Sequence, residues 1–466
     1  MQQTRVGGRF WGVGLAAALF VGSCSSDSAS GDPMGMGGAA GALPQGGAGA
    51  GGIGGQSNGG TGINTGGLGG IGAVGGIGGS AGMANAGGGA VGAGTGGIAG
   101  SVATGDSGID EQPEEPPPYE LDCGADAIVL EGHGPPANRI NYIIVGDGYN
   151  EADLDTTYVE HLEEMLSTRF TPEFEPYLRY RRFINICALK VASAQSGINE
   201  SAGDTAFDGY GNDESRLGYI NDDKVYDKID ELLPAAIEVD WTGVVLNDDR
   251  WWNSGGRIMV WSGGHQDAAL AAEHEGGHSF QRLADEYGGN CTFEGDESEM
   301  RINVTMDATD TAGKWSQWLE FDHSPGTGVQ GTFEGAQYCD QGAYRPSEES
   351  VMNMLWDSSY YNAISREQGV RIIYEKIDPI DASTPSDVST VQTLNVQVID
   401  PAVIKLEWSV DGQVVTGQTS ADFDVAAQGL PAGDHAITAR AYDDTDWVRG
   451  DRAELEQTVE WTITVP

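Results

Sequence analysis

The chain has 466 residues, a formal net charge of -46 at pH 7 and a sequence pI near 4.1. This length is too great for one ordinary domain. A strongly acidic surface repels phosphate backbones and anionic membrane faces, so we expect no nucleic-acid partner. Acidic residues run through most of the chain after its Gly-rich part, which indicates a generally solvated acidic surface rather than one acidic tail.

The first 23 residues are typical of an export signal. Arg5 and Arg9 supply a positive start, and the apolar run at residues 11–21 is too short for a comfortable membrane-spanning helix. The run leads through Gly and Ser to Cys24, which resembles the processing site of bacterial lipoproteins, where the Cys becomes the lipidated N-terminus. An ordinary signal peptide with a chance Cys is the alternative. We predict a lipid anchor at Cys24 and a place in the bacterial cell envelope, in the outer membrane or at the cell surface.

Residues 24–118 are dominated by Gly, Ala, Ser and isolated Ile, with an acidic, Pro-rich end. The repeated Gly-Gly-Ile-Gly-Gly pattern has no strict three-residue period, which excludes collagen. This composition cannot bury enough apolar surface to offset the entropy of ordering. We therefore predict a disordered Gly-rich tether.

The folded part is predicted to begin near residue 119. Leu154, Tyr158, Leu162 and Met165 follow helical spacing and predict a helix over residues 151–170. Short apolar runs predict strands at 140–145, 183–191, 244–246 and 257–261. Because strands and helices interleave, we predict an α+β domain over residues 119–380, with helices packed on a mixed β-sheet.

A further unit is predicted over residues 386–466, after a polar, Pro-containing linker at 381–386. Several short strands with alternating apolar residues and turn signals indicate an immunoglobulin-like β-sandwich. Trp408 and Trp461 are the expected large core residues. This unit contains no cluster of His and Glu, so we expect it to have a core of its own and to take no part in bond cleavage.

His274, Glu275 and His278 form the pattern His-Glu-Gly-Gly-His, after an Ala-rich run that starts at Asp267 and predicts a helix. Residues four apart lie on one helix face, so the two imidazoles can bind one Zn²⁺ at about 2.0–2.1 Å. Glu275 can reach a zinc-bound water and take its proton as a general base. A chance match on a buried helix is the weaker interpretation, because the chain has only 7 His.

The longer segment at 274–287, His-Glu-Gly-Gly-His-Ser-Phe-Gln-Arg-Leu-Ala-Asp-Glu-Tyr, resembles the IgA-peptidase family of zinc metallopeptidases. Further stretches are similar to that family, including Ile-Asn-Tyr-Ile-Ile-Val-Gly-Asp-Gly-Tyr at 140–149. The resemblance covers about residues 139–377 and does not extend to the tether or the sandwich. It implies a zincin-like catalytic domain with metzincin features, a Zn²⁺ cofactor and a protein or peptide substrate. It also implies that Met352 lies in a turn beneath the zinc ligands.

The sequence identifies the third zinc ligand less directly than it identifies the two His. In metzincins it follows a Gly that breaks the helix, but the corresponding positions here hold Gln and Ala. An uninterrupted helix would carry Asp285 roughly 10 Å beyond His278 along the axis, so either the helix breaks near Leu283 or the ligand lies elsewhere. The family's Asp-Glu-Tyr triplet favours Asp285 as the ligand. Glu286 is the next candidate, and both acids could instead support the ligands.

Apart from Cys24, the chain contains Cys123, Cys187, Cys291 and Cys339. An even number of Cys in an exported protein permits disulfides, and four Cys allow three pairings. We favour Cys291–Cys339, because both flank the later part of the catalytic region.

The predicted function is a zinc-dependent endopeptidase that hydrolyses extracellular or periplasmic proteins by attack of a zinc-bound water, with Glu275 as general base. Tyr287, Tyr344 and Arg345 are candidates to stabilise the oxyanion. The main alternative is a surface-anchored binding or adhesion lipoprotein with an inactive peptidase fold, which the tether and sandwich would suit. An amidase with the same zinc chemistry is a weaker alternative. The intact His-Glu-His pattern favours the enzyme.

Overall fold

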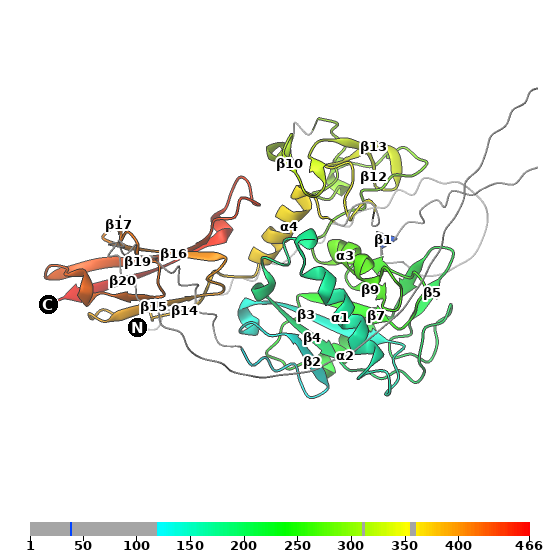
Figure 1. The fold of residues 1–466 in the computed structure, drawn as a ribbon, viewed down its shortest axis with the longest axis horizontal. Helices are drawn as coiled ribbons and strands as arrows, with labels where there is room; N and C mark the ends of the chain where they lie inside the picture. Colours follow the sequence, from blue (N-terminus) through cyan, green and yellow to red (C-terminus); the bar gives the residue numbers. More distant parts are fainter. Residues whose placement is uncertain (1–37, 40–118, 310–312, 355–359) are drawn as a thin grey trace, which may run out of the picture.

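The computed structural model describes residues 38–39, 119–309, 313–354 and 360–466. The predicted signal, Cys24 and, apart from residues 38–39, the predicted tether lie outside the described residues. The described chain forms a larger lobe of helices and strands and a smaller all-β lobe that extends to one side (Figure 1). None of the described helices combines the length and apolar character needed to cross a membrane.

A seven-stranded mixed sheet forms the centre of the larger lobe. Its order is β1 (Gly38–Ala39), β8 (Ser254–Gly255), β9 (Met259–Ser262), β7 (Trp241–Leu246), β3 (Ile140–Asp147), β4 (Ile184–Leu189) and β2 (Ala127–Glu131). The four inner strands β9, β7, β3 and β4 run parallel, and the outer strands pair antiparallel with their neighbours. These inner strands overlap the four predicted strands, and the mixed sheet with its helices confirms the predicted α+β class.

Helices cover both faces of this sheet. The described residues form four α-helices, which are α1 (Thr157–Arg169), α2 (Asp222–Leu232), α3 (Ala268–Ser279) and α4 (Ala363–Tyr374). Tyr142 and Ile144 of β3 belong to the hydrophobic cluster on the side of α1 and α3, whereas Ile143 and Val145 belong to the cluster on the side of α2. This alternation follows from the pleat of a strand, and burial on both sides explains why the strand is a continuous apolar run.

In the described part of the larger lobe, three hairpins lie outside the main sheet. They are β5 (Tyr210–Asn212) with β6 (Leu217–Tyr219), β10 (Asp322–His323) with β11 (Gly328–Val329), and β12 (Phe333–Ala336) with β13 (Cys339–Arg345). A disulfide between Cys291 and Cys339 joins the loop that follows α3 to the first residue of β13. This bond confirms the pairing favoured from the sequence.

The smaller lobe is a β-sandwich of two antiparallel sheets. One sheet has the order β14 (Ile380–Ser383), β15 (Thr393–Val398) and β18 (Asp422–Asp424); the other has the order β17 (Gln413–Val414), β16 (Ile404–Val410), β19 (Gly433–Asp443) and β20 (Glu456–Val465). The ring of Trp408 stacks on Phe423 of the opposite sheet at 4.8 Å and lies 5.7 Å from Trp461, so both Trp are core residues as predicted. The first strand includes part of the expected linker, because β14 begins at Ile380.

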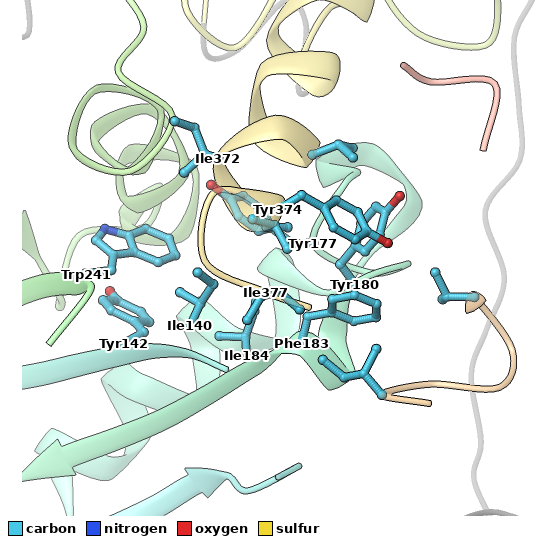
Figure 2. Close-up of a cluster of buried hydrophobic side chains, with 14 of the residues drawn as sticks. Ile140, Tyr142, Tyr177, Tyr180, Phe183, Ile184, Trp241, Ile372, Tyr374 and Ile377 are labelled. Atoms are coloured by element: carbon cyan, nitrogen blue, oxygen red, sulfur yellow. The ribbon is translucent and has the colours of Figure 1, made fainter. Parts of the chain in front are cut away.

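The two lobes share one hydrophobic cluster. Tyr180, Phe183, Tyr374 and Ile377 lie together where β4 and α4 approach each other (Figure 2), and the same cluster continues to Trp408 in the centre of the sandwich. The ring of Phe183 packs against the edges of Tyr180 and Tyr374 at 5.1 and 5.9 Å. The sequence predicted a separate core for the sandwich, and the continuous cluster corrects that expectation.

A buried carboxylate strengthens the joint between the lobes. Asp443, at the end of β19, has a side chain with no exposed surface. It accepts hydrogen bonds from Arg179 Nη2 at 2.8 Å, the Tyr180 hydroxyl at 2.5 Å, the Tyr374 hydroxyl at 3.0 Å and the backbone N–H of Thr445 at 2.9 Å. These four donors supply the hydrogen bonds that a buried charged group needs.

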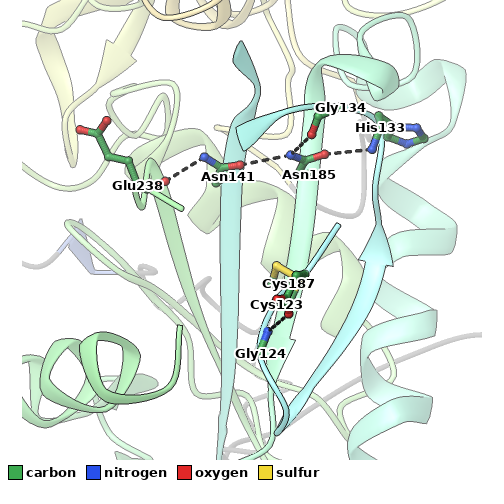
Figure 3. The surroundings of a disulfide bond; sticks show 9 residues. Cys123, Gly124, His133, Gly134, Asn141, Asn185, Cys187 and Glu238 are labelled. Atoms are coloured by element: carbon green, nitrogen blue, oxygen red, sulfur yellow. Dashed lines mark hydrogen bonds between the residues drawn. A yellow bond between two sulfur atoms is a disulfide. The ribbon is translucent and has the colours of Figure 1, made fainter. Parts of the chain in front are cut away.

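The segment that enters the larger lobe is fastened by a second disulfide, Cys123–Cys187 (Figure 3). Both Cys are buried, and the bond joins the residues before the edge strand β2 to the inner strand β4. Nearby, Asn185 of β4 donates from its amide to Asn141 of β3 at 3.3 Å and to the backbone carbonyl of Gly134 at 3.0 Å. These contacts hold the beginning of the fold to the central sheet.

Candidate metal centre

Helix α3 carries the His-Glu-His pattern in the interior of the larger lobe. The helix lies against β8, β9 and α1, and its Ala and Gly residues allow this close approach. His274 is 3% exposed and Glu275 is 1% exposed. A Cβ on Gly277 would overlap Sδ of Met352, which therefore lies directly against the helix. Met352 thus has the position under the helix that the sequence suggested.

Each imidazole is oriented by a backbone carbonyl. Nδ1 of His274 lies 2.9 Å from the carbonyl oxygen of Val351, and Nδ1 of His278 lies 3.0 Å from that of Leu283. Because a carbonyl can only accept, these contacts assign a proton to each Nδ1 and leave each Nε2 available as a metal ligand. The two Nε2 atoms face each other at 3.2 Å.

Asp285 reaches this pair because the helix ends early. The last helical residue is Ser279, and the backbone N–H of Leu283 bonds back to the carbonyl of Gly277 at 2.9 Å. Arg282 adopts the left-handed region with φ 60°, which reverses the chain after the helix. The sequence left open whether the helix breaks before Asp285 or the ligand lies elsewhere. In the structure, the helix ends at Ser279 and Asp285 lies near both imidazoles.

Three ligand atoms form a nearly equilateral triangle. Oδ1 of Asp285 lies 3.1 Å from Nε2 of His274 and 3.2 Å from Nε2 of His278, and the nitrogens are themselves 3.2 Å apart. A tetrahedral zinc with bonds of about 2.0–2.1 Å separates its ligand atoms by about 3.3 Å. The triangle therefore has the size of one face of such a coordination shell, and its two-nitrogen, one-carboxylate composition is suitable for zinc.

Glu286, the other candidate ligand, points into a different network. Its carboxylate accepts hydrogen bonds from Asn303 at 2.8 Å, Asn362 at 2.8 Å and Ser350 at 2.5 Å. Ser350 immediately precedes Val351 and Met352, so this network fixes the turn whose carbonyl orients His274. Of the two acids, the structure brings only Asp285 to the imidazoles.

Glu275 lies beside the triangle and not at its third corner. Its carboxylate and the two imidazoles offer atoms that lie within 4.8 Å of one another, a looser group than the triangle. Oε2 of Glu275 is buried without a hydrogen-bond partner among the described residues. Burial raises the pKa of this carboxyl to about 7, partly opposed by the two neighbouring His. A Cβ on Gly255 of β8 would lie 2.7 Å from Oε2, so this strand passes close to the carboxylate.

The pKa values of His278 and Asp285 are shifted because opposite charges lie close together in the triangle. Burial alone would lower the pKa of His278, but the Asp285 carboxylate outweighs burial and raises that pKa to about 9. Burial alone would raise the pKa of Asp285, but the two His lower it well below its usual range. A divalent cation would replace the protons that the imidazoles otherwise take up.

A buried ion pair supports the opposite side of α3. Nε of Arg169 on α1 donates to Oε1 of Glu273 at 2.8 Å, and both side chains are fully buried. The guanidinium lies 4.3 Å from the ring centroid of Trp241, and the Tyr361 hydroxyl donates to the carbonyl of Glu273. These contacts fix the helix position one residue before His274.

Tyr338 is a site residue that the sequence did not indicate. Its hydroxyl donates to Oδ2 of Asp285, and its ring lies 5.2 Å from that of Tyr287. Of the suggested oxyanion residues, Arg345 instead donates to the backbone carbonyls of Glu334, Gly335 and Glu348. The Tyr344 hydroxyl faces Glu334 at 3.5 Å. No local pattern marks Tyr338, because it reaches Asp285 only through the turn between β12 and β13.

Comparisons with known proteins identify one family. Residues 128–329, less than half of the chain, match the model of a family described as IgA Peptidase M64. No curated protein sequence matches the chain. Among solved structures, an endo-β-1,4-mannanase from Thermotoga petrophila is 17% identical over 30% of each chain, with a TM-score of 0.14, which is too low to support an argument. The family match includes α3 and Asp285 and ends before Tyr338.

Proposed function

From the membership of residues 128–329 in the IgA peptidase M64 family, which makes this part of the chain a peptidase domain, we propose that the protein is a zinc-dependent endopeptidase. His274, His278 and Asp285 are the proposed zinc ligands. The observation that carries the proposal is the triangle of their ligand atoms, with sides of 3.1–3.2 Å and both imidazoles oriented through Nδ1. The helix-borne zinc motif beside a mixed sheet supports a zincin-like domain, and the two facing sheets support an immunoglobulin-like sandwich.

Glu275 is the proposed general base. When bound, zinc would supply Lewis-acid chemistry that polarises the scissile carbonyl and makes water more acidic. Glu275 takes a proton from the attacking water and passes it to the leaving amine. Its raised pKa, about 7, suits both tasks near neutral pH. Its tight environment beside Gly255 holds the carboxylate in place and keeps bulk water away.

Replacing Glu275 by Gln tests this assignment. We expect zinc to stay bound at about one ion per chain and hydrolysis of casein to fall by roughly 10²–10⁴-fold, because the variant keeps the ligands and loses the base. The exposed Glu460→Gln in the sandwich is the matched control, with casein hydrolysis unchanged. Normal turnover in Glu275→Gln would refute the role. Zinc bound to a wild-type protein that cleaves no peptide would favour a binding lipoprotein instead.

We also propose that a lipid on Cys24 holds the peptidase at the bacterial cell envelope. The support is the apolar run at residues 11–21 followed by Val-Gly-Ser-Cys. Cys24→Ser should move the protein from the membrane fraction to the soluble fraction, which immunoblotting of fractionated cells would measure. Unchanged membrane fractionation would contradict the anchor. The substrate class is a protein or peptide reached from that position.

A further inference from the structure

We propose that the hydroxyl of Tyr338 is a catalytic group that hydrogen-bonds the carbonyl oxygen of the scissile peptide as negative charge develops there. This inference rests on the proposed peptidase function and assigns one more residue to it. In the hydrolysis, the oxygen of water bonds to the carbonyl carbon and the C–N bond breaks. Glu275 carries the proton from water to the amine nitrogen, and Tyr338 keeps its own proton throughout.

The position of the hydroxyl carries the first part of the argument. It donates to Oδ2 of Asp285, whose Oδ1 faces both imidazoles at 3.1 and 3.2 Å. Only the Asp285 carboxylate therefore separates the Tyr338 hydroxyl from the two imidazoles. A donor at this place can reach a carbonyl oxygen bound at the open side of the triangle.

The second argument is the backbone turn that presents this side chain. Ala336 and Cys339 are paired across the hairpin, so Gln337 and Tyr338 are its two turn residues. Both adopt the left-handed region, with φ 52° and 64°. Such turns favour Asn and Gly, and bulky residues rarely adopt positive φ. Strain of this kind at an active-site turn suggests that the side chain it presents is needed.

The Tyr338 hydroxyl is a donor with access to solvent. A phenol is protonated at neutral pH and can donate its proton. The residue is 38% exposed, because its ring borders the outside of the site. A bound peptide can therefore contact Tyr338 without displacing the core.

Tyr287 completes the arrangement. Its ring packs edge-on against that of Tyr338 at 5.2 Å, and its backbone carbonyl accepts the N–H of Tyr338 at 3.1 Å. These two contacts hold the ring of Tyr338 in place, while rotation about the C–O bond can turn the hydroxyl proton from Asp285 to the substrate. The disulfide at Cys339, the next residue, fixes the turn to the loop at Cys291.

The test is Tyr338→Phe, which removes one oxygen and keeps the ring. We expect kcat for casein-derived peptides to fall by roughly 10²–10³-fold, the usual loss for one oxyanion donor, with KM changed less than about threefold. Zinc content and melting temperature should match those of the wild type. The control is Tyr442→Phe on β19 of the sandwich, which should leave kcat unchanged because this strand belongs to the other lobe.

A binding measurement separates this inference from the proposed function. We would titrate the zinc-loaded protein with a phosphinic Ala–Ala pseudopeptide, which carries a charged oxygen where the reacting carbonyl would be. Tyr338→Phe should bind it roughly 10²–10³-fold more weakly, even if no hydrolysed substrate is found. Equal affinity and kcat in the variant would overturn the proposal. Loss of zinc from the variant would also overturn it, because Tyr338 would then only orient Asp285.

Discussion

Two buried aspartates, Asp443 between the lobes and Asp285 in the segment that follows α3, have opposite surroundings. Asp443 accepts four hydrogen bonds from groups whose protons are fixed, including Arg179 at 2.8 Å. Oδ1 of Asp285 has no hydrogen-bond partner among the described residues and instead faces two imidazole nitrogens. A buried carboxylate with all its partners stabilises a fold, whereas one with an incomplete set indicates a ligand site.

The largest effect should follow from removing the whole sandwich, which carries Asp443. A chain that ends at Ile380 would expose Tyr374, Ile377 and Phe183, which now belong to the cluster shared with the sandwich. The loss should exceed the total stability of an ordinary domain, about 5–15 kcal/mol, and leave no cooperative thermal transition. Residues 119–466 are the control and should melt cooperatively. A truncated chain that melts cooperatively and binds zinc would show that the peptidase lobe is independent.

Single substitutions at the two aspartates should separate stability from metal binding. Asp443→Ala leaves the buried Arg179 charge unpaired and should lower the free energy of unfolding by about 3–5 kcal/mol, with zinc affinity unchanged. Asp285→Ala should weaken zinc binding by more than the roughly 10–100-fold typical of losing a supporting contact. It should affect the metal-free fold less, because imidazoles can release their protons and a guanidinium cannot.

Denaturant titration in EDTA and zinc titration would measure both quantities. Arg440→Ala in the sandwich is the control, since its pair with Glu456 is exposed on both sides and is worth at most about 1 kcal/mol. Zinc retained by Asp285→Ala would contradict a metal-binding role for Asp285. An Asp443→Ala variant that unfolds no more easily than the control would contradict a stabilising role for Asp443.

The smallest expected step, about tenfold for each pH unit, is a pH dependence of zinc affinity. In the metal-free protein, the carboxylate of Asp285 outweighs burial and raises the pKa of His278 to about 9, from 6.5 in the unfolded chain. The protonated imidazole therefore stabilises the metal-free fold below about pH 6.5, and this contribution disappears as the pH rises to about 9. Zinc must displace the same proton, so its affinity should rise by roughly tenfold per pH unit over that range.

Calorimetry in buffers of different ionisation enthalpy would count the protons released with zinc. An affinity that stays constant between pH 6.5 and 9, or no proton release at pH 7, would contradict this account.

The sequence predicted the parts of the fold that depend on local periodicity. The helical spacing at 151–170 and the Ala-rich run after Asp267 correspond to α1 and α3. The inner strands overlap the predicted apolar runs, because burial on both faces gives a simple pattern. The sequence also predicted that His274, Glu275 and His278 lie close together, because four residues span about one helical turn.

Other features depend on single backbone angles or distant contacts. Asp285 approaches the imidazoles because Arg282 adopts positive φ at a position where the sequence has no Gly. Tyr338 is presented by a turn that contains neither Gly nor Asn. Asp443 lies in an ordinary strand end, and its partners Arg179 and Tyr374 are 264 and 69 residues away. Periodicity contains no information about such pairs, so the shared core and the catalytic Tyr could not be predicted.

The Cys123–Cys187 disulfide would have a mechanical consequence for a chain held at its N-terminal end, as the proposed lipid anchor implies. A pull on the N-terminal segment would otherwise act on the edge strand β2 and peel it from β4 one hydrogen-bonded pair at a time. The disulfide lies ahead of β2 and passes the force directly to β4, inside the sheet. Single-molecule pulling should therefore show a lower unfolding force after reduction, and an unchanged force would show that β2 is not the weak point.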